Sequence, residues 1–186
     1  MSVEIDGRAS LRETRPVRYL TIVRHAKAEK ASSDGRDFER KLSDRGRRQC
    51  EQLRVWASDK SELGRFGPTT ALVSSAARTK ETFRRAFDGT VFAGERVLSE
   101  LIYNGQRHVS AEDLLIDLAS IDPVTTSLAV VAHNPTVLEL LWSLVDALPE
   151  SLRAGFPLGG AYVLALPDDQ PIGLTHYPLV ARYVPD

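Results

Sequence analysis

Apolar runs alternate with amphipathic stretches along most of the chain. Continuous apolar runs predict strands at about 18–23, 70–73, 128–132 and 161–166. The amphipathic stretches between and after them predict helices at about 44–57, 78–87, 111–120 and 135–147. A short strand near 91–97 and an edge strand near the C-terminus complete the expected set. This alternation favours a three-layer α/β/α fold with a mostly parallel central sheet.

Basic side chains follow three of the predicted strands. Arg24-His25-Ala26 comes directly after the first strand, Arg78 lies just past the second, and His133-Asn134-Pro135 follows the third. Because the carboxyl ends of parallel strands lie along one edge of a sheet, we expect these side chains to converge there. A guanidinium binds phosphate in a bidentate manner, and an imidazole can attack phosphorus. The pattern therefore predicts a pocket for a phosphoryl group.

Residues that commonly cap helices stand before the predicted helices. They are Ser43, Ser75, Ser110 and Asn134. The helices after Ser75 and Asn134 begin at the same sheet edge as the basic side chains, and a helix N-terminus favours an anion. The pair Ser74-Ser75 lacks the Gly-x-Ser-x-Gly turn of a nucleophilic serine, so we expect it to cap a helix rather than to react.

Composition and charge narrow the picture. A chain of 186 residues with 42% hydrophobic and 26% charged residues is typical of one globular domain, which we place at 19–186 behind a flexible tail at 1–18. The net charge of −1 gives no indication of nucleic acid or an acidic membrane as partner. Cys50 is the only cysteine, which excludes an internal disulfide and fits a reducing compartment. Since we find neither a signal peptide nor a membrane-length apolar run, we expect a cytoplasmic protein.

The basic motifs resemble the signature of the histidine phosphatase superfamily, which has the phosphoglycerate-mutase-like fold, and their spacing is similar to its SixA-type phosphohistidine phosphatase branch. Further similar segments are 37–48, which resembles the opening of the family's first helix, and 156–161, which resembles a late loop entering a core strand. The resemblance covers roughly 19–166. One departure is Ala26, because the family usually has glycine there; it would matter only if that turn needs a positive φ.

The resemblance implies roles for four residues. His25 would attack phosphorus and form a phosphohistidine that water hydrolyses, with inorganic phosphate as product. Arg24 and Arg78 would neutralise the phosphoryl oxygens, and a protonated His133 would add a third donor. No metal or other cofactor is implied. The expected substrate is phosphohistidine on a protein, such as a phosphotransfer domain.

Two further residues keep two interpretations each. The segment 98–105 resembles the one that supplies the catalytic acid in mutase-like members, so Glu100 is either that acid or an ordinary loop carboxylate. Arg40 either reaches the phosphoryl group or substrate, or lies solvated near the first helix.

Three alternatives to a phosphohistidine phosphatase stay open at this point. The chain could be a phosphatase for small phosphomonoesters with Glu100 as acid, a phosphate-binding module without turnover, or a structural α/β domain. The loops at 27–42 and 98–110 are too short to build a large lid over a small substrate, which favours a protein substrate. His108 and His176 have no partners at a metal-ligand spacing, so we expect them to be structural or on the surface.

Overall fold

The computed structural model describes residues 17–58, 69–90, 94–105, 107–124, 126–173 and 175–185. The expected tail falls outside this part of the chain up to residue 16, as does part of the strand expected near 91–97. Arg18 does not belong to a tail. It lies in the first strand, is 4% exposed, and donates hydrogen bonds to the Asp122 carboxylate and the Gln170 carbonyl.

A six-stranded sheet forms the centre of the fold, in the order β3-β2-β4-β1-β5-β6. The strands are β1 (Val17–Arg24), β2 (Thr69–Ser74), β3 (Arg96–Ser99), β4 (Ser127–Ala132), β5 (Ala161–Pro167) and β6 (Leu179–Tyr183). Neighbours from β3 to β1 are parallel, whereas β5 and β6 are antiparallel to their neighbours. The mostly parallel sheet and the C-terminal edge strand are confirmed.

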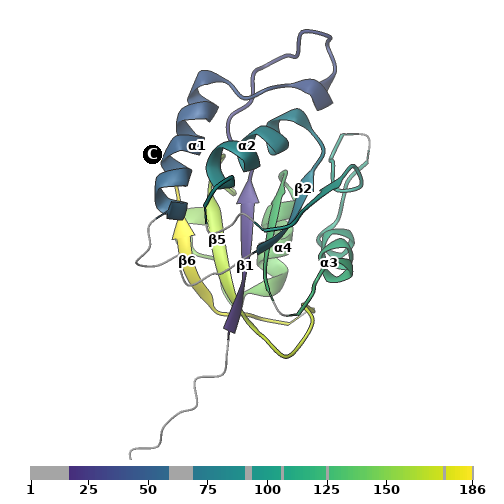
Figure 1. The fold of residues 1–186 in the computed structure, drawn as a ribbon, viewed down its shortest axis with the longest axis vertical. Helices are drawn as coiled ribbons and strands as arrows, with labels where there is room; N and C mark the ends of the chain where they lie inside the picture. The colour runs from purple at the N-terminus through teal and green to yellow at the C-terminus, as the bar shows by residue number, and fades with distance from the viewer. Residues whose placement is uncertain are drawn as a thin grey trace, which may run out of the picture.

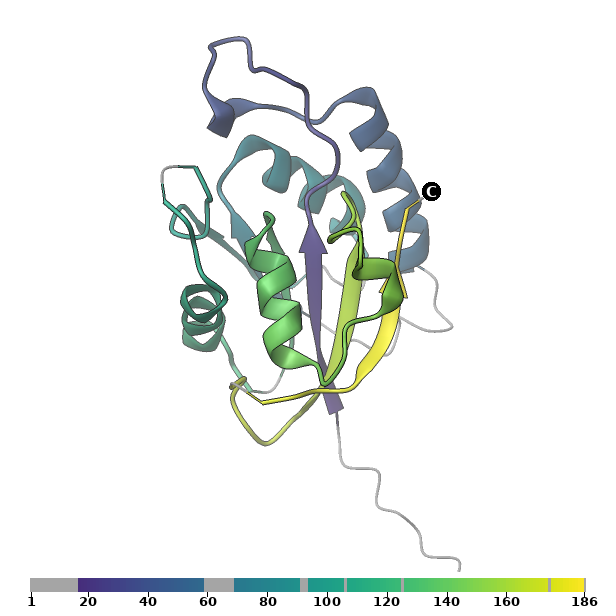
Figure 2. The same cartoon turned by 180° about the vertical axis from the view of Figure 1, so that it is seen from behind.

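Helices cover both faces of the sheet. They are α1 (Asp44–Ser58), α2 (Ala77–Phe87), α3 (Ala111–Ser120) and α4 (Thr136–Leu144), with short 3₁₀ turns η1 (Asp37–Glu39) and η2 (Glu150–Leu152). Figure 1 shows α1 and α2 in front of the sheet, and Figure 2 shows α3 and α4 on its other side. Each layer has its own apolar core, one around Leu53 and Phe83 and the other around Leu140 and Tyr162. The three-layer prediction is confirmed.

Of the four predicted helix caps, two are confirmed and two are wrong. Ser43 accepts a hydrogen bond from the Gly46 N–H, and Ser110 forms a capping box, as expected. The other two expected caps are wrong. Helix α2 is preceded by Ala76 and α4 by Pro135, and neither start has a side-chain cap. At α2 the reason is that the Ser75 N–H still donates to the Ser99 carbonyl, as in the sheet, so the helix begins later.

The strand order places three strand ends side by side. In β1, Arg24 pairs with Ala132 of β4, and Val73 of β2 pairs with Val131 of β4. The residues that follow these strands therefore leave the sheet at the same edge, which is the usual ligand edge of an α/β sheet. Within the described residues, none of the helices combines the length and apolar character that crossing a bilayer requires.

Candidate active site

His25 lies just past β1 with its ring held by the main chain. Its Nδ1 is 2.8 Å from the Ala26 carbonyl oxygen, which can only accept a hydrogen bond, so Nδ1 carries the proton. Burial lowers the pKa of His25 to about 3, and the charges of Arg78 and Arg24 act in the same direction. The neutral ring therefore has its lone pair on Nε2, which is the form that a nucleophilic imidazole requires.

His133 lies beside His25 just past β4. The two ring centroids are 5.0 Å apart, and Nε2 of His133 is 2.9 Å from the Ser74 hydroxyl oxygen at the end of β2. Burial lowers the pKa of His133 to about 2, with His25 and Arg78 adding to the effect. The ring is thus neutral in this structure, whereas the sequence analysis expected a protonated ring with phosphate bound.

Arg24 and Arg78 lie close enough for their charges to act on both histidine rings, and the protein holds part of each guanidinium group. Nη1 of Arg24 donates to the Phe156 carbonyl oxygen at 2.6 Å. Nη1 and Nη2 of Arg78 donate to the main-chain oxygen and carboxylate of Asp37 at 2.8 and 3.0 Å. Only 5% of Arg78 is exposed, so this pairing compensates a buried charge.

Asp37 is the centre of a second polar cluster that sequence reasoning did not find. Its carboxylate accepts hydrogen bonds from Tyr103 at 2.6 Å, from Arg40 at 2.6 Å and from Arg78. Partial burial acts to raise the pKa of Asp37, but the Tyr103 hydrogen bond and the Arg78 and Arg40 charges outweigh it and lower the pKa to about 2. Arg40 also donates to the Glu29 carbonyl, so it is neither free nor merely solvated.

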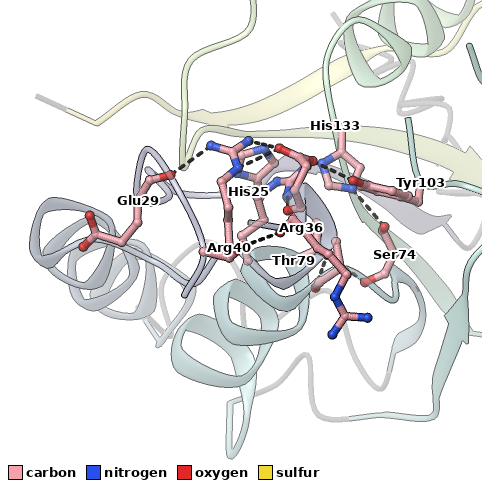
Figure 3. A network of polar contacts seen from close by, with 12 residues as sticks. His25, Glu29, Arg36, Arg40, Ser74, Thr79, Tyr103 and His133 are labelled. Atoms are coloured by element: carbon pink, nitrogen blue, oxygen red, sulfur yellow. Dashed lines mark hydrogen bonds and ion pairs between the residues drawn. The ribbon is translucent and has the colours of Figure 1, made fainter. Parts of the chain in front are cut away.

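Figure 3 shows His25, His133 and Tyr103 gathered together, with Arg40 toward His25 and Ser74 toward His133. The aromatic ring of Tyr103 meets the His133 ring edge-on at 5.6 Å, and the Arg78 guanidinium lies 5.6 Å from the Tyr103 ring centre. These contacts tie the loop after β3 to the end of β4 and to the first turn of α2.

Arg24, Arg78 and His133 are each held at one atom or more while a further, buried atom is left unpaired. Four buried side-chain atoms have no hydrogen-bond partner among the described residues, namely Arg24 Nε, Arg78 Nε, His133 Nδ1 and Asn134 Oδ1. Buried polar atoms of this kind are rare in native structures and call for a partner such as an ordered water, an ion or a ligand. Three of the four atoms belong to the basic set, and two of those three are in guanidinium groups. The arrangement therefore suits an oxyanion such as a phosphoryl group.

Glu100 lies apart from this cluster. It is exposed and lines a groove of about 670 Å³ together with Arg36, Phe38, Leu101, Tyr103 and Arg107. Among the described residues, no hydrogen bond or ion pair joins its carboxylate to the basic side chains. The groove nevertheless reaches the site, because Tyr103 belongs to both.

Ala26 fits its position without strain. Its side chain is fully buried, its N–H donates to Thr82 Oγ1 at 3.0 Å, and it is not among the described residues with a positive φ. The departure from the usual glycine therefore does not disturb this turn.

No family model matches the chain, and no curated protein matches it. The SixA protein of Agrobacterium tumefaciens, assigned as a phosphohistidine phosphatase, is 28% identical with a TM-score of 0.70, over 90% of this chain and 98% of that one. SixA of Nakamurella multipartitia is 24% identical with a TM-score of 0.68, over 91% and 97%. A protein histidine phosphatase SixA complexed with tungstate is 16% identical with a TM-score of 0.67, over 89% and 96%.

These similarities extend over nearly the whole of each chain and agree with the sheet order and helical layers described above. The expected resemblance is confirmed: the chain has the phosphoglycerate-mutase-like fold of the histidine phosphatase superfamily and is similar to its SixA-type phosphohistidine phosphatases.

Proposed function

We propose that the protein is a phosphatase that removes the phosphoryl group from a phosphohistidine on another protein, through a phosphohistidine formed on its own His25. The observation that carries this proposal is the held, neutral ring of His25, with Nδ1 bonded to the Ala26 carbonyl and Nε2 left for attack. Its neighbours Arg24, Arg78 and His133 supply the surroundings that a phosphoryl group needs.

In the first step, the Nε2 lone pair of His25 attacks phosphorus in line as the phosphorus–nitrogen bond of the substrate breaks. The bonding electrons stay on the substrate imidazole, which is protonated when it leaves. Phosphorylated His25 carries positive charge, and its Nδ1–H bond to the Ala26 carbonyl stabilises that charge. In the second step, water attacks phosphorus, the bond to Nε2 breaks, and inorganic phosphate and neutral His25 result.

The arginines stabilise the charge on the three equatorial oxygens during both steps. Each has one end fixed by the protein before substrate arrives, so little reorganisation is needed at the moment of reaction. Removing one such preorganised donor typically lowers the rate by about a hundred- to a thousandfold.

The groove beside Tyr103 supports a large substrate. A volume of about 670 Å³ exceeds what one imidazole ring fills, so the remainder of a protein segment has room there. One similar structure, of a protein histidine phosphatase SixA complexed with tungstate, is consistent with this choice, since tungstate is an oxyanion like phosphate.

A phosphatase for small phosphomonoesters is the second candidate, favoured by the position of Glu100 in the same groove. An alkoxide or aryloxide leaving group needs a proton donor more than a protonated imidazole does, and Glu100 would supply it. In that case Glu100→Gln lowers the turnover of an aryl phosphate sharply. With a phosphohistidine substrate the same change has little effect.

The deciding experiment is a paired turnover assay without added metal, using a phosphohistidine-bearing peptide and an aryl phosphate. The wild type is compared with His25→Ala, which removes the nucleophile and leaves the fold intact. Fast, His25-dependent loss of phosphohistidine with weak aryl phosphate turnover supports the proposal, and the reverse preference supports the second candidate. Phosphate binding without turnover of either substrate would make the protein a binding module.

A further inference from the structure

His133 and Ser74 form a buried pair, and the reaction steps proposed above give their contact no role. Nε2 of His133 lies 2.9 Å from the Ser74 hydroxyl oxygen, and the two residues are 3% and 0% exposed. Ser74 is the last residue of β2, and His133 follows the last residue of the adjacent strand β4. The contact therefore joins two strand ends beneath the site (Figure 3).

A neutral histidine in this contact has two proton arrangements. In the first, the Ser74 hydroxyl donates to Nε2, and Nδ1 carries the ring proton. In the second, Nε2 carries the proton and donates it to the Ser74 oxygen, which leaves a lone pair on Nδ1. The two arrangements present opposite polarity at Nδ1, so only one of them can donate to an anion.

The surroundings favour the first arrangement once an anion is bound. Nδ1 is buried and has no hydrogen-bond partner among the described residues. In the second arrangement its lone pair would face a phosphoryl oxygen, and the Ser74 hydroxyl proton would also need another acceptor. The first arrangement uses the serine proton on Nε2 and offers the Nδ1 proton to the phosphoryl oxygen, so every polar atom of the pair is satisfied.

We propose that Ser74 is a positioning residue that fixes the tautomer of His133, so that neutral His133 donates an Nδ1–H hydrogen bond to the phosphoryl group. This inference rests on the proposed function, which supplies the phosphoryl ligand. It explains how His133 serves as an anion donor without being an imidazolium, in agreement with a pKa held far below its usual range by burial and by Arg78. It also gives Ser74 a role other than helix capping or nucleophilic attack.

The test is ring ¹⁵N NMR of the full-length protein saturated with inorganic phosphate, together with a phosphate titration. Ser74→Ala removes the hydroxyl, Ser74→Thr keeps it, and Ser75→Ala is the matched control on the next residue. His133→Asn assigns the His133 signals by their loss. In wild type and Ser74→Thr we expect a protonated Nδ1 and an unprotonated Nε2 on His133. Ser74→Ala loses this preference and binds phosphate about tenfold more weakly, the size expected for one buried hydrogen bond, whereas Ser75→Ala matches the wild type.

A protonated Nε2, or an imidazolium, on His133 in the phosphate-bound wild type overturns the inference. Unchanged phosphate affinity and tautomer in folded Ser74→Ala do so as well. Neither readout uses turnover, so these failures are distinct from a failure of the proposed phosphohistidine substrate. A wild type that does not bind phosphate at all overturns both.

Discussion

The two halves of the site are held by different parts of the chain. At the end of β1, main-chain carbonyls hold both residues: Ala26 accepts from His25, and Phe156 accepts from Arg24. At the ends of β2 and β4, side chains take part: Ser74 meets His133, and the Asp37 carboxylate holds Arg78. A main-chain acceptor survives substitution of its own side chain, whereas a side-chain partner is lost with a single change. The β1 half should therefore be robust to mutation around it, and the other half should be adjustable.

The largest expected effect is a difference in turnover between variants of His25 and of His133. His25→Asn removes the nucleophile, so turnover of a phosphohistidine peptide should fall by at least about a thousandfold. His133→Asn places an amide N–H near the position of Nδ1, so it keeps a donor and should lose only about tenfold. Steady-state kinetics of both variants measure the difference. His176→Asn, at an exposed histidine paired with Asp146, is the control and should leave the rate unchanged. Equal losses in the two site variants would contradict distinct roles.

The second prediction concerns how the free energy of unfolding depends on pH. The rings of His25 and His133 should contribute to this dependence alike. Their pKa values in the folded protein are lowered to about 3 and about 2, from the ordinary value of 6.5. Below about pH 6.5 the unfolded chain therefore binds more protons than the folded protein. The full contribution of the two neutral rings to the free energy of unfolding is then present above about pH 6.5. It falls as the pH drops toward the folded values, by about 1.4 kcal/mol per pH unit for each ring.

Urea unfolding at pH 8, 7, 6 and 5 measures this slope. His133→Asn removes one of the two titrating rings and should reduce the steepness between pH 6 and 5 by about half. A wild-type unfolding free energy that is flat from pH 7 to 5 would show that the rings are not held neutral.

The third prediction concerns Asp37, in the half of the site that side chains hold. Asp37→Asn keeps the main-chain acceptor for Arg78 but removes the carboxylate charge that also binds Tyr103 and Arg40. We expect kcat/KM to fall about tenfold, because half of the Asp37 side chain is exposed and its pairing is partly screened. Asp34→Asn is the matched control, since that carboxylate pairs with Arg36 in the same loop. Equal kinetics in the two variants would mean that the Asp37 carboxylate does not orient Arg78.

The same division describes what the sequence could predict. Strands and helices followed from local patterns, and α3 was predicted at its observed bounds because Ser110 and the Asp122-Pro123 break mark both ends. The gathering of the four basic residues followed from their places just after parallel strands. In the β1 half, the His25 contact joins neighbouring residues, whereas Arg24 meets Phe156 across 132 positions of the chain.

The side-chain partners were missed because they depend on tertiary contacts. Asp37 meets Tyr103 across 66 positions of the chain, and Ser74 meets His133 across 59. No periodicity or cap motif indicates such contacts, and the sequence analysis assigned the Ser74-Ser75 pair to helix capping. A polar residue at the last position of a buried strand was the one available signal, since Ser74 lies at the predicted ligand edge.

The smallest effect is expected where the main chain does the holding. Ala26→Gly keeps the carbonyl that accepts from His25, so the kcat/KM of the variant should stay within about twofold of the wild type. The buried methyl group is lost and the backbone of the unfolded chain gains freedom, so the free energy of unfolding should fall by about 1–2 kcal/mol. Urea unfolding and steady-state kinetics on one preparation check both numbers. A tenfold change in kcat/KM with unchanged stability would mean that the side chain at position 26, and not the main chain alone, sets the orientation of His25.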